Sequence, residues 1–326
     1  MDGFRESRGA GWTRAREILE GLFRSLAPRG ARVEVGYVKR VGDGVSREVY
    51  GAPVGISPDP DRWSDAYAIL LPRSDSDESP DEIDRRTRWE AELLSRLPSF
   101  RLPFRTCRAA GVVPESGRSV LVRTFLNGIP LDLRSGQQGQ VEPWVEVARV
   151  AAAIHAVPGE RLGGGTPGHP TLRAHALDEL KALDGLPGPD FDEARSWAAA
   201  HLPPEAPSSL VHGDLLGQNI ILGVGEPNGV IDWEYSRRGD HAFDLAIVTR
   251  CKGSPFKLAD GMTRLLRAYR DAGGAEVTEA HVRLYELCLA ANWHRGALRG
   301  DRYADPPEQS LGRFRNVLKR AREAGE

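Results

Sequence analysis

The stretch LVHGDLLGQNIILGVGEPNGVIDWEYSRRGD, residues 210–240, constrains the fold more than any other part of the chain. It places His212, Asp214 and Asn219 in one short segment, and Asp232 follows thirteen residues after Asn219. Apolar runs flank these polar residues, and a Pro-Asn-Gly turn signal precedes VIDWEY, so we expect short strands on both sides. A rigid scaffold holds residues at such strand ends in place while they stay open to a ligand, which suits catalysis.

The segment HGDLLGQN matches the H-x-D-L-x-x-x-N pattern of the protein-kinase catalytic loop, with Gly213 where that loop has arginine. In that geometry the aspartate orients the attacking hydroxyl, while the asparagine and a later aspartate ligate the Mg²⁺ that bridges the phosphates. Asp232 stands where the later aspartate is expected. Aspartate and asparagine are also common turn residues, but the combined pattern favours a phosphoryl-transfer site built from Asp214, Asn219 and Asp232.

Composition is typical of a globular chain that is long enough for two domains or one bilobal unit, with 326 residues of which 40% are apolar and 28% charged. Lysine plus arginine (44) nearly balance aspartate plus glutamate (46), so no strong field indicates a nucleic-acid partner. The N-terminus lacks a signal-peptide core, and no apolar run reaches the roughly 18 residues of a membrane span. We therefore expect a cytoplasmic protein without a membrane partner.

Cysteine usage excludes two further classes of protein. Cys107, Cys251 and Cys288 are far apart in the chain and form no C-x-x-C pair. This spacing indicates neither a disulfide framework nor a structural zinc site, and it predicts buried apolar cysteines.

Periodicity changes character near residue 125. Before it, apolar spacing predicts helices at 12–26 and 85–100 and strands at 33–41, 46–54, 65–72 and 119–126, with a turn at Gly42 to Gly44 and a loop at 72–82. After the connector LNGIP, helical spacing dominates and predicts helices at 144–157, 175–186, 190–202, 261–273 and 280–298. The pattern predicts a strand-rich first part and a helical second part.

LVHGDLLGQNIIL, GVIDWEYSRRGD and FDLA resemble the signature of the aminoglycoside phosphotransferases and related small-molecule kinases. The resemblance implies an α+β, protein-kinase-like bilobal fold. Its small antiparallel-sheet lobe, residues 1–126, would bind the nucleotide, and its mainly helical lobe, residues 127–326, would carry the catalytic loop and the acceptor site. It also implies Mg²⁺ as cofactor, ATP or GTP as phosphoryl donor and a small-molecule hydroxyl as acceptor.

The resemblance assigns roles to individual positions. It makes Asp214 the catalytic base and Asn219 and Asp232 metal ligands, while Asp240 and Asp244 would brace the loop and the following helix. The implied nucleotide-binding residues are Gly42, Gly44 and Ser46 in the phosphate loop, Glu90 on a helix, and the hinge positions Thr124 and Leu126.

One departure from the family pattern affects Glu90. The family pairs this glutamate with a lysine of the third strand, which should lie near Leu70, but YAILLPR contains no lysine. Arg73, three residues further on, or Arg47 on the preceding strand could supply the charge, although a guanidinium does not reproduce an ammonium contact atom for atom.

The acceptor is first expected to be an aminoglycoside, which would make the protein a resistance enzyme. Acidic residues of the helical part would bind such a polycation, with Glu234 and Glu286 foremost and Glu279, Asp301 and Asp305 as further candidates. Segments RLPFRTCRAAG and LLRAYRDAGG are similar to macrolide kinases, so a macrolide 2'-phosphotransferase is an alternative. Homoserine, choline and fructosamine kinases share the catalytic pattern, and a non-catalytic nucleotide-binding protein is the remaining alternative.

Overall fold

The chain folds as two compact units. Unit 1 comprises Met1–Arg101 and Arg105–Asn127, and unit 2 comprises Leu102–Phe104 and Gly128–Glu326. The structure, a computed structural model, describes residues 3–44, 46–57, 65–73, 78–134, 138–139, 141–249, 260–302 and 304–325. Cys251 and residues 74–77 of the predicted 72–82 loop lie outside this range.

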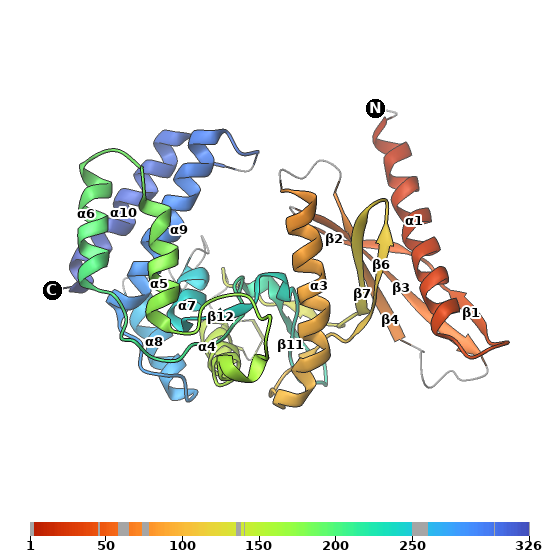
Figure 1. Cartoon of the computed structure of the whole chain (residues 1–326). Coiled ribbons are helices and arrows are strands. Elements are labelled where there is room, and N and C mark those ends of the chain that lie inside the picture. Colours follow the sequence, from red (N-terminus) through yellow and green to blue (C-terminus); the bar gives the residue numbers. More distant parts are fainter. Residues whose placement is uncertain are drawn as a thin grey trace. The chain divides into compact units, whose positions relative to one another are not determined.

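Unit 1 is built on a six-stranded antiparallel sheet (Figure 1). The strand order is β1-β3-β4-β7-β6, and β2 also pairs with β3. The strands are β1 (Arg32–Val35), β2 (Lys39–Asp43), β3 (Arg47–Ser57), β4 (Asp65–Pro72), β6 (Ala109–Glu115) and β7 (Arg118–Thr124). The short helix η1 (Leu97–Phe100) and β5 (Arg105–Thr106) precede β6 in the chain.

A helix covers each face of this sheet, α1 (Gly3–Leu26) on one side and α3 (Pro80–Arg96) on the other (Figure 1). Because side chains alternate along a strand, Tyr67, Ile69 and Leu71 of β4 join the apolar core beneath α1. Ala68 and Leu70, which are also buried, belong to the opposite face. Side chains alternate in the same way on the neighbouring strands β3 and β7, so only every second residue of these strands faces α3.

The sequence predictions for unit 1 were wrong in three places. The strand expected at 33–41 is divided into β1 and β2, because the chain bends at Gly36, whose N–H donates to the Pro53 carbonyl at 2.9 Å. Helix α3 begins at Pro80 inside the predicted loop, and the Ser79 hydroxyl caps it by accepting from the Glu82 N–H at 3.2 Å. Strand β6 was not predicted at all.

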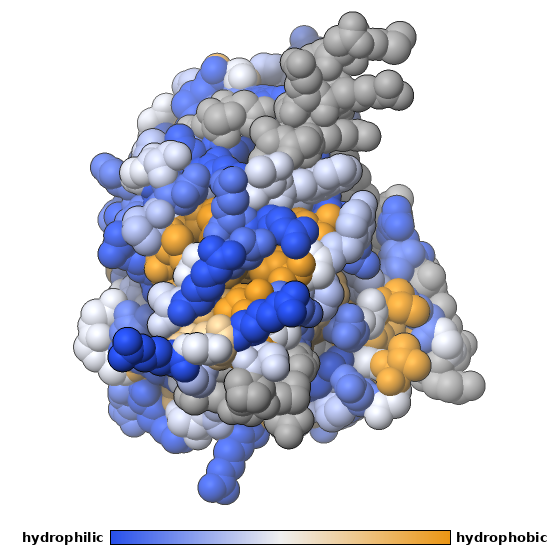
Figure 2. All heavy atoms as spheres, turned by 90° about the vertical axis from the view of Figure 1, so that its right-hand side faces the viewer, coloured by the Kyte–Doolittle hydropathy of each residue, from blue (hydrophilic) through white to orange (hydrophobic). Residues whose placement is uncertain are grey.

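Figure 2 shows the face of unit 1 on the side of α1 and β1, where long hydrophilic side chains run across hydrophobic atoms. Two arginines tie α1 to the sheet. Arg14 donates to Glu115 of β6 at 2.7 Å, and Arg16 donates to the Val35 carbonyl of β1 at 2.9 Å. The aliphatic stems of such side chains can cover apolar surface while their charged ends stay at the surface.

Unit 2 is mainly helical. Its α-helices are α4 (Pro143–His155), α5 (Leu172–Glu179), α6 (Pro189–Ala200), α7 (His241–Thr249), α8 (Gly261–Asp271), α9 (Glu279–Arg299) and α10 (Pro307–Gly325). Its short strands are β8 (Ile129–Pro130), β9 (Ser209–Val211), β10 (Ile220–Leu222), β11 (Gly229–Val230) and β12 (Arg237–Gly239). Its 3-10 helices are η2 (Gly159–Leu162), η3 (Leu180–Leu183), η4 (Gly217–Asn219) and η5 (Trp233–Tyr235).

Helix α9 forms the middle of unit 2, since it packs against α7 and α10, while α4 packs against α7 and α8. The residues of α9 are almost all buried over Val282 to Ala291, which the predicted apolar helix at 280–298 anticipates. Helix α10 was missed, because only Phe314, Leu318 and Ala321 give its charged sequence an apolar stripe.

Cys107 and Cys288 are buried thiols, as expected. Burial raises the pKa of the Cys288 thiol well above its usual value. None of the helices formed by the described residues is long and apolar enough to cross a membrane.

Candidate functional site

Asp214 lies in a tight loop between β9 and the short helix η4. Its carbonyl oxygen accepts a hydrogen bond from the Leu216 N–H at 2.7 Å, and the Asn219 N–H donates to the Leu216 carbonyl at 2.9 Å. Asp214 is partly exposed, whereas Leu215 beside it is fully buried. The loop therefore anchors itself through Leu215 and leaves the carboxylate of Asp214 accessible.

Asn219 is hydrogen-bonded to Asp214 through its side chain. Its amide nitrogen donates to the Asp214 carbonyl oxygen at 2.8 Å and to the carboxylate Oδ2 at 3.3 Å. Since the amide group is planar and its two ends differ in role, this contact directs the Asn219 oxygen away from the Asp214 backbone. The spacing of five residues thus produces a direct contact, as the catalytic-loop pattern predicts.

Asp232 lies beside Asn219 because β10 and β11 form a hairpin. Ile220 pairs with Val230, and the Ile231 N–H donates to the Asn219 carbonyl at 3.0 Å. Asp232 has φ 70° and ψ 58°. This left-handed conformation is uncommon outside glycine and is often found at functional sites. Within the described residues, no hydrogen bond or ion pair engages the Asp232 carboxylate.

His212 connects the two halves of this site. Its ring Nε2 lies 3.0 Å from the Ile231 carbonyl oxygen, and its Nδ1 accepts from the Asp214 N–H at 3.3 Å. The ring is fully buried and its centroid lies 4.7 Å from that of Trp233. His212 therefore connects the backbone N–H of Asp214 to the carbonyl of Ile231, the residue before Asp232.

Asp244 of α7 binds the backbone of the same loop. Its carboxylate accepts from the backbone N–H of His212 at 2.7 Å and of Gly213 at 2.8 Å, and His155 Nε2 lies 3.1 Å away. Burial alone would raise the pKa of Asp244, but the hydrogen bonds from His155 and the loop lower it below its usual value. A carboxylate that is fully buried and charged fixes the loop backbone electrostatically.

Asp240 directly precedes α7, the helix that carries Asp244. It accepts from the Ala242 N–H at 2.9 Å and the Tyr285 hydroxyl at 3.0 Å, and His281 Nε2 lies 2.6 Å away. Burial opposes its charge, but the contact with His281 lowers the pKa of Asp240 below its usual value. Asp240 therefore connects α7 to α9, which matches the structural role expected of it.

Gly213 replaces the arginine of the protein-kinase pattern for a steric reason. Its φ is +81°, and a Cβ at this position would lie 2.2 Å from the Tyr235 carbonyl oxygen. Only glycine adopts this conformation readily. A side chain at position 213 is incompatible with the observed loop.

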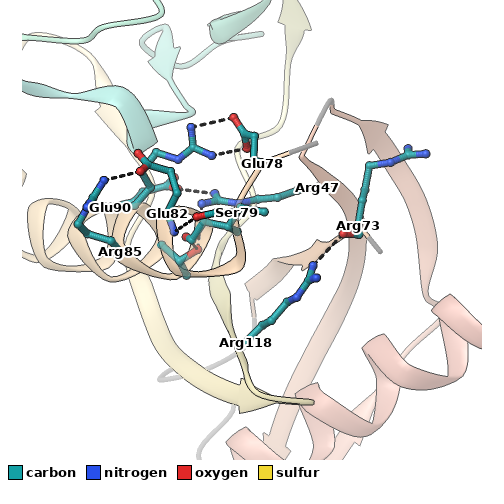
Figure 3. Close-up of polar contacts among 11 residues, drawn as sticks. Arg47, Arg73, Glu78, Ser79, Glu82, Arg85, Glu90 and Arg118 are labelled. Carbon is teal, nitrogen blue, oxygen red and sulfur yellow. Dashed lines mark hydrogen bonds and ion pairs between the residues drawn. The ribbon is translucent and has the colours of Figure 1, made fainter. Parts of the chain in front are cut away.

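In unit 1, Glu90 has an arginine partner. Arg47 of β3 donates to Glu90 Oε2 at 3.0 Å and to the Thr87 hydroxyl at 2.9 Å, and all three residues are buried (Figure 3). Arg123 of β7 lies 4.0 Å from Glu90 Oε1. Arg73, the other expected donor of charge, points away from this group in Figure 3. The Glu90 partner is thus Arg47.

The loop predicted to position the nucleotide runs from Gly42 to Ser46, but its first two residues belong to strand β2. Gly42 belongs to β2, which continues to Asp43, and the Gly44 N–H donates to the Arg47 carbonyl at 2.8 Å. Ser46 is buried, and its carbonyl accepts from the Arg73 N–H at 2.9 Å. The described part of this turn therefore makes hairpin contacts of its own.

The expected hinge residues differ in their backbone contacts. The Thr124 N–H donates to the Arg108 carbonyl, and the Thr124 hydroxyl accepts from the Arg108 N–H, each at 2.9 Å. Leu126, beyond the end of β7, makes no such backbone hydrogen bond among the described residues. Leu126 is therefore better placed than Thr124 to offer its N–H to a ligand.

The acidic acceptor candidates mostly have basic partners. Glu286 is 6% exposed and pairs with Arg283, which also pairs with Glu279 at 2.7 Å. Asp301 pairs with Arg299, and Asp305 pairs with Arg313. Glu234 is 7% exposed and directly follows Trp233 in η5, so it is the candidate nearest in sequence to Asp232.

Donor chemistry at the loop fits magnesium. Asn219 and Asp232 bring an amide oxygen and a carboxylate to neighbouring positions of one hairpin, and Mg²⁺ prefers such oxygen ligands together with water and phosphate. Among the described residues, no cluster of three or more His, Cys, Asp or Glu side chains forms an all-protein metal cage. The arrangement therefore suits a cation that a phosphate substrate helps to hold.

Comparison with known sequences identifies the family. The phosphotransferase enzyme family matches residues 73–299, and the chain belongs to this family of enzymes. Viomycin phosphotransferase of Streptomyces vinaceus is 36% identical over 108 residues, which are 32% of this chain and 31% of that protein. Homoserine kinase of Neisseria meningitidis serogroup B is 36% identical over 58 residues, 18% of each chain. The chain thus aligns with less than a third of the length of these curated relatives.

Solved structures show the same fold. A protein of Ralstonia eutropha JMP134, provisionally assigned as an aminoglycoside phosphotransferase, has a TM-score of 0.66 at 18% identity and covers 95% of this chain and 97% of its own. Macrolide 2'-phosphotransferase MphH of Brachybacterium faecium has a TM-score of 0.60 at 18% identity, covering 91% and 98%. The GDP and kanamycin complex of APH(2'')-IIIa has 0.56 at 15%, covering 89% and 94%. The expected fold is therefore confirmed.

Proposed function

We propose that this chain is a Mg²⁺-dependent phosphotransferase that moves the γ-phosphoryl group of ATP or GTP to a hydroxyl group of a small molecule. The observation that carries the proposal is the contact of Asn219 with Asp214, beside an Asp232 held in a left-handed conformation. Family membership supports the reaction class.

In this proposal Asp214 orients the acceptor hydroxyl and takes its proton. Asn219 and Asp232 hold Mg²⁺, which when bound neutralises the charge of the transferred phosphoryl group. His212, Gly213 and Asp244 keep the loop fixed, so the reactive groups are positioned before the substrate arrives. Catalysis then rests on alignment and charge, because a loose phosphoryl-transfer transition state requires little covalent assistance.

The two units have separate tasks in the proposal. Residues 1–126 bind the nucleotide, with Gly42, Gly44, Ser46, Glu90, Thr124 and Leu126 as the residues nearest to it. Residues 127–326 carry the catalytic loop and bind the acceptor. A GDP complex of a solved relative supports a nucleotide as the phosphoryl donor.

An aminoglycoside is the first acceptor that we propose, and kanamycin in a solved relative supports it. Glu234 is the preferred acceptor contact because it lies two residues after Asp232, and Glu286, which pairs with Arg283, is second. Viomycin is a second candidate, favoured by the 36% identity to viomycin phosphotransferase. Macrolides, homoserine, choline and fructosamines complete the panel of alternatives.

A nucleotide-release assay tests the function. Purified protein with Mg²⁺ and either ATP or GTP is offered each acceptor of the panel, and ADP or GDP release is coupled to a spectrophotometric readout. We expect one acceptor class to stimulate release and Asp214→Asn to abolish it while nucleotide binding persists. Gln218→Ala, an exposed neighbour in the same loop, is the matched control and should keep normal turnover. Near-normal turnover of Asp214→Asn would refute the role of Asp214, and nucleotide binding without stimulated release would indicate a non-catalytic protein.

A further inference from the structure

The strand that should carry the phosphate-binding lysine presents an apolar side chain instead. Leu70 of β4 is 2% exposed and belongs to the sheet face opposite the α1 core, the face that α3 covers. It pairs with Val49 on β3 and with Leu121 on β7. The arginines that contact Glu90 on this face come from the two strands that flank β4.

Both flanking strands supply an arginine to the same face. Arg47 lies two residues before Val49 on β3, so it is a diagonal neighbour of Leu70, and such neighbours are within reach of long side chains. Arg123 lies two residues after Leu121 on β7. The two guanidinium groups approach Glu90 of α3 from either side, at 3.0 Å and 4.0 Å.

Arg73 is excluded from this group by strand alternation. Residues 67, 69 and 71 of β4 face α1, and position 73 continues this series. Figure 3 shows its side chain directed away from Glu90, while the Arg118 guanidinium donates to its carbonyl at 2.8 Å. The sequence allows either Arg73 or Arg47 to replace the lysine, but only Arg47 contacts Glu90.

The position of Arg47 points to phosphate. It directly follows the turn between β2 and β3, and its carbonyl accepts the Gly44 N–H that closes this turn. Burying a charged cluster is costly, and an apolar cluster of similar volume is often at least as stable. Glu90 and Thr87 hold Nη1 and Nη2 of Arg47 and so fix the plane of its guanidinium beside this turn, and a planar guanidinium suits phosphate oxygens.

We propose that Arg47 is the residue that contacts the nucleotide phosphates in this chain, in place of a β4 lysine, and that Glu90 and Thr87 position its guanidinium. Arg123 balances the second oxygen of Glu90 and so acts through Glu90. The inference rests on the proposed function, because it assigns one residue of the nucleotide site. Unlike the proposed function, the inference concerns only the affinity of the protein for the nucleotide phosphates.

A ligand series separates phosphate contact from folding. Isothermal titration calorimetry of the whole chain with adenosine, AMP, ADP and ATP, all with Mg²⁺, gives the dependence of affinity on the number of phosphates. For Arg47→Met we expect roughly 10- to 100-fold weaker ATP binding, the loss of a charge-assisted hydrogen bond, with adenosine binding unchanged within twofold. Arg47→Lys keeps the charge and should recover part of the loss.

Controls distinguish the possible failures. Arg73→Met removes the other possible arginine and should bind ATP normally. Arg47→Met combined with Glu90→Gln avoids an unbalanced buried carboxylate and should show the same phosphate-dependent loss at a normal melting temperature. If the wild type binds ATP but Arg47→Met weakens adenosine and ATP equally, or if Arg73→Met shows the phosphate-dependent loss, the inference is wrong and the proposed function stands. If the wild type binds neither this series nor guanosine, GMP, GDP and GTP titrated in the same way, both are wrong.

Discussion

Gly213→Ala is the substitution whose effect the structure defines most closely. The Cβ of alanine would lie 2.2 Å from the Tyr235 carbonyl oxygen and 2.7 Å from its carbonyl carbon, both backbone atoms that cannot rotate away. The backbone at Gly213 also has φ +81°, a conformation that L-residues rarely adopt. Either the loop moves, or the folded protein is destabilised both by the steric overlap with Tyr235 and by the left-handed conformation.

Two contributions set the magnitude. The left-handed conformation costs alanine about 1–2 kcal/mol, and overpacking against a fixed backbone costs about 1–3 kcal/mol. We expect the free energy of unfolding to fall by about 3 kcal/mol. Relief of the clash requires the loop to shift by about 1 Å, and a misplacement of this size costs roughly 100-fold in turnover. The Gly213 N–H contact with Asp244 would be lost in the same movement.

Gly225→Ala provides the matched control. Gly225 has a similar φ of +73°, but a Cβ there would have no atom within 4 Å. It should lose only about 1 kcal/mol, the conformational part alone, and keep normal turnover. Urea denaturation and the nucleotide-release assay measure both effects. Equal losses of stability in the two variants, with turnover unchanged at Gly213→Ala, would show that the loop is not constrained as described.

Further predictions concern the loop supports and the metal. Asp244→Asn weakens two buried backbone contacts and should cost roughly 2–4 kcal/mol in urea denaturation. Burial lowers the pKa of His241 to about 4, so between pH 6.5 and 4 the unfolded chain binds a proton that the folded chain does not. Acidification from pH 7 to 5 should therefore lower the free energy of unfolding by about 2 kcal/mol. This contribution is complete above pH 6.5 and is lost as the pH falls towards 4, and His241→Gln should remove it. Asp232→Asn should raise the Mg²⁺ concentration for half-maximal turnover roughly tenfold or more, with the acceptor KM unchanged.

Periodicity predicted those elements whose own sequence favours one secondary structure over the others. Strand β4 occupies the predicted residues 65–72, because a continuous apolar run bounded by breakers has few alternatives. Strand β6 escaped prediction, since Gly111 and Pro114 interrupt it and each of its residues is only partly buried or exposed. Its existence depends on pairing with β7, a contact that no local pattern reveals.

The contact between Asp214 and Asn219 could be predicted from the spacing of the two residues. Asp214 and Asn219 are five residues apart and contact one another directly, so their contact does not depend on how distant parts of the chain pack. The partner of Glu90 could not be predicted, since Arg47 is 43 residues away and reaches it only through the register of β3 beside β4. A charged residue inside an apolar strand, as in VLVRT, was the available signal for Arg123.

The left-handed backbone at Asp232 sets the stability of the main chain against the proposed metal-binding role of its carboxylate. Glycine there would relax the main chain and, by the usual cost of this conformation, stabilise the protein by about 1 kcal/mol, yet it would remove a carboxylate. A mutant library screened only for heat tolerance should therefore become enriched in glycine or asparagine at this codon. A library screened for phosphotransfer turnover should keep aspartate and accept the lower melting point.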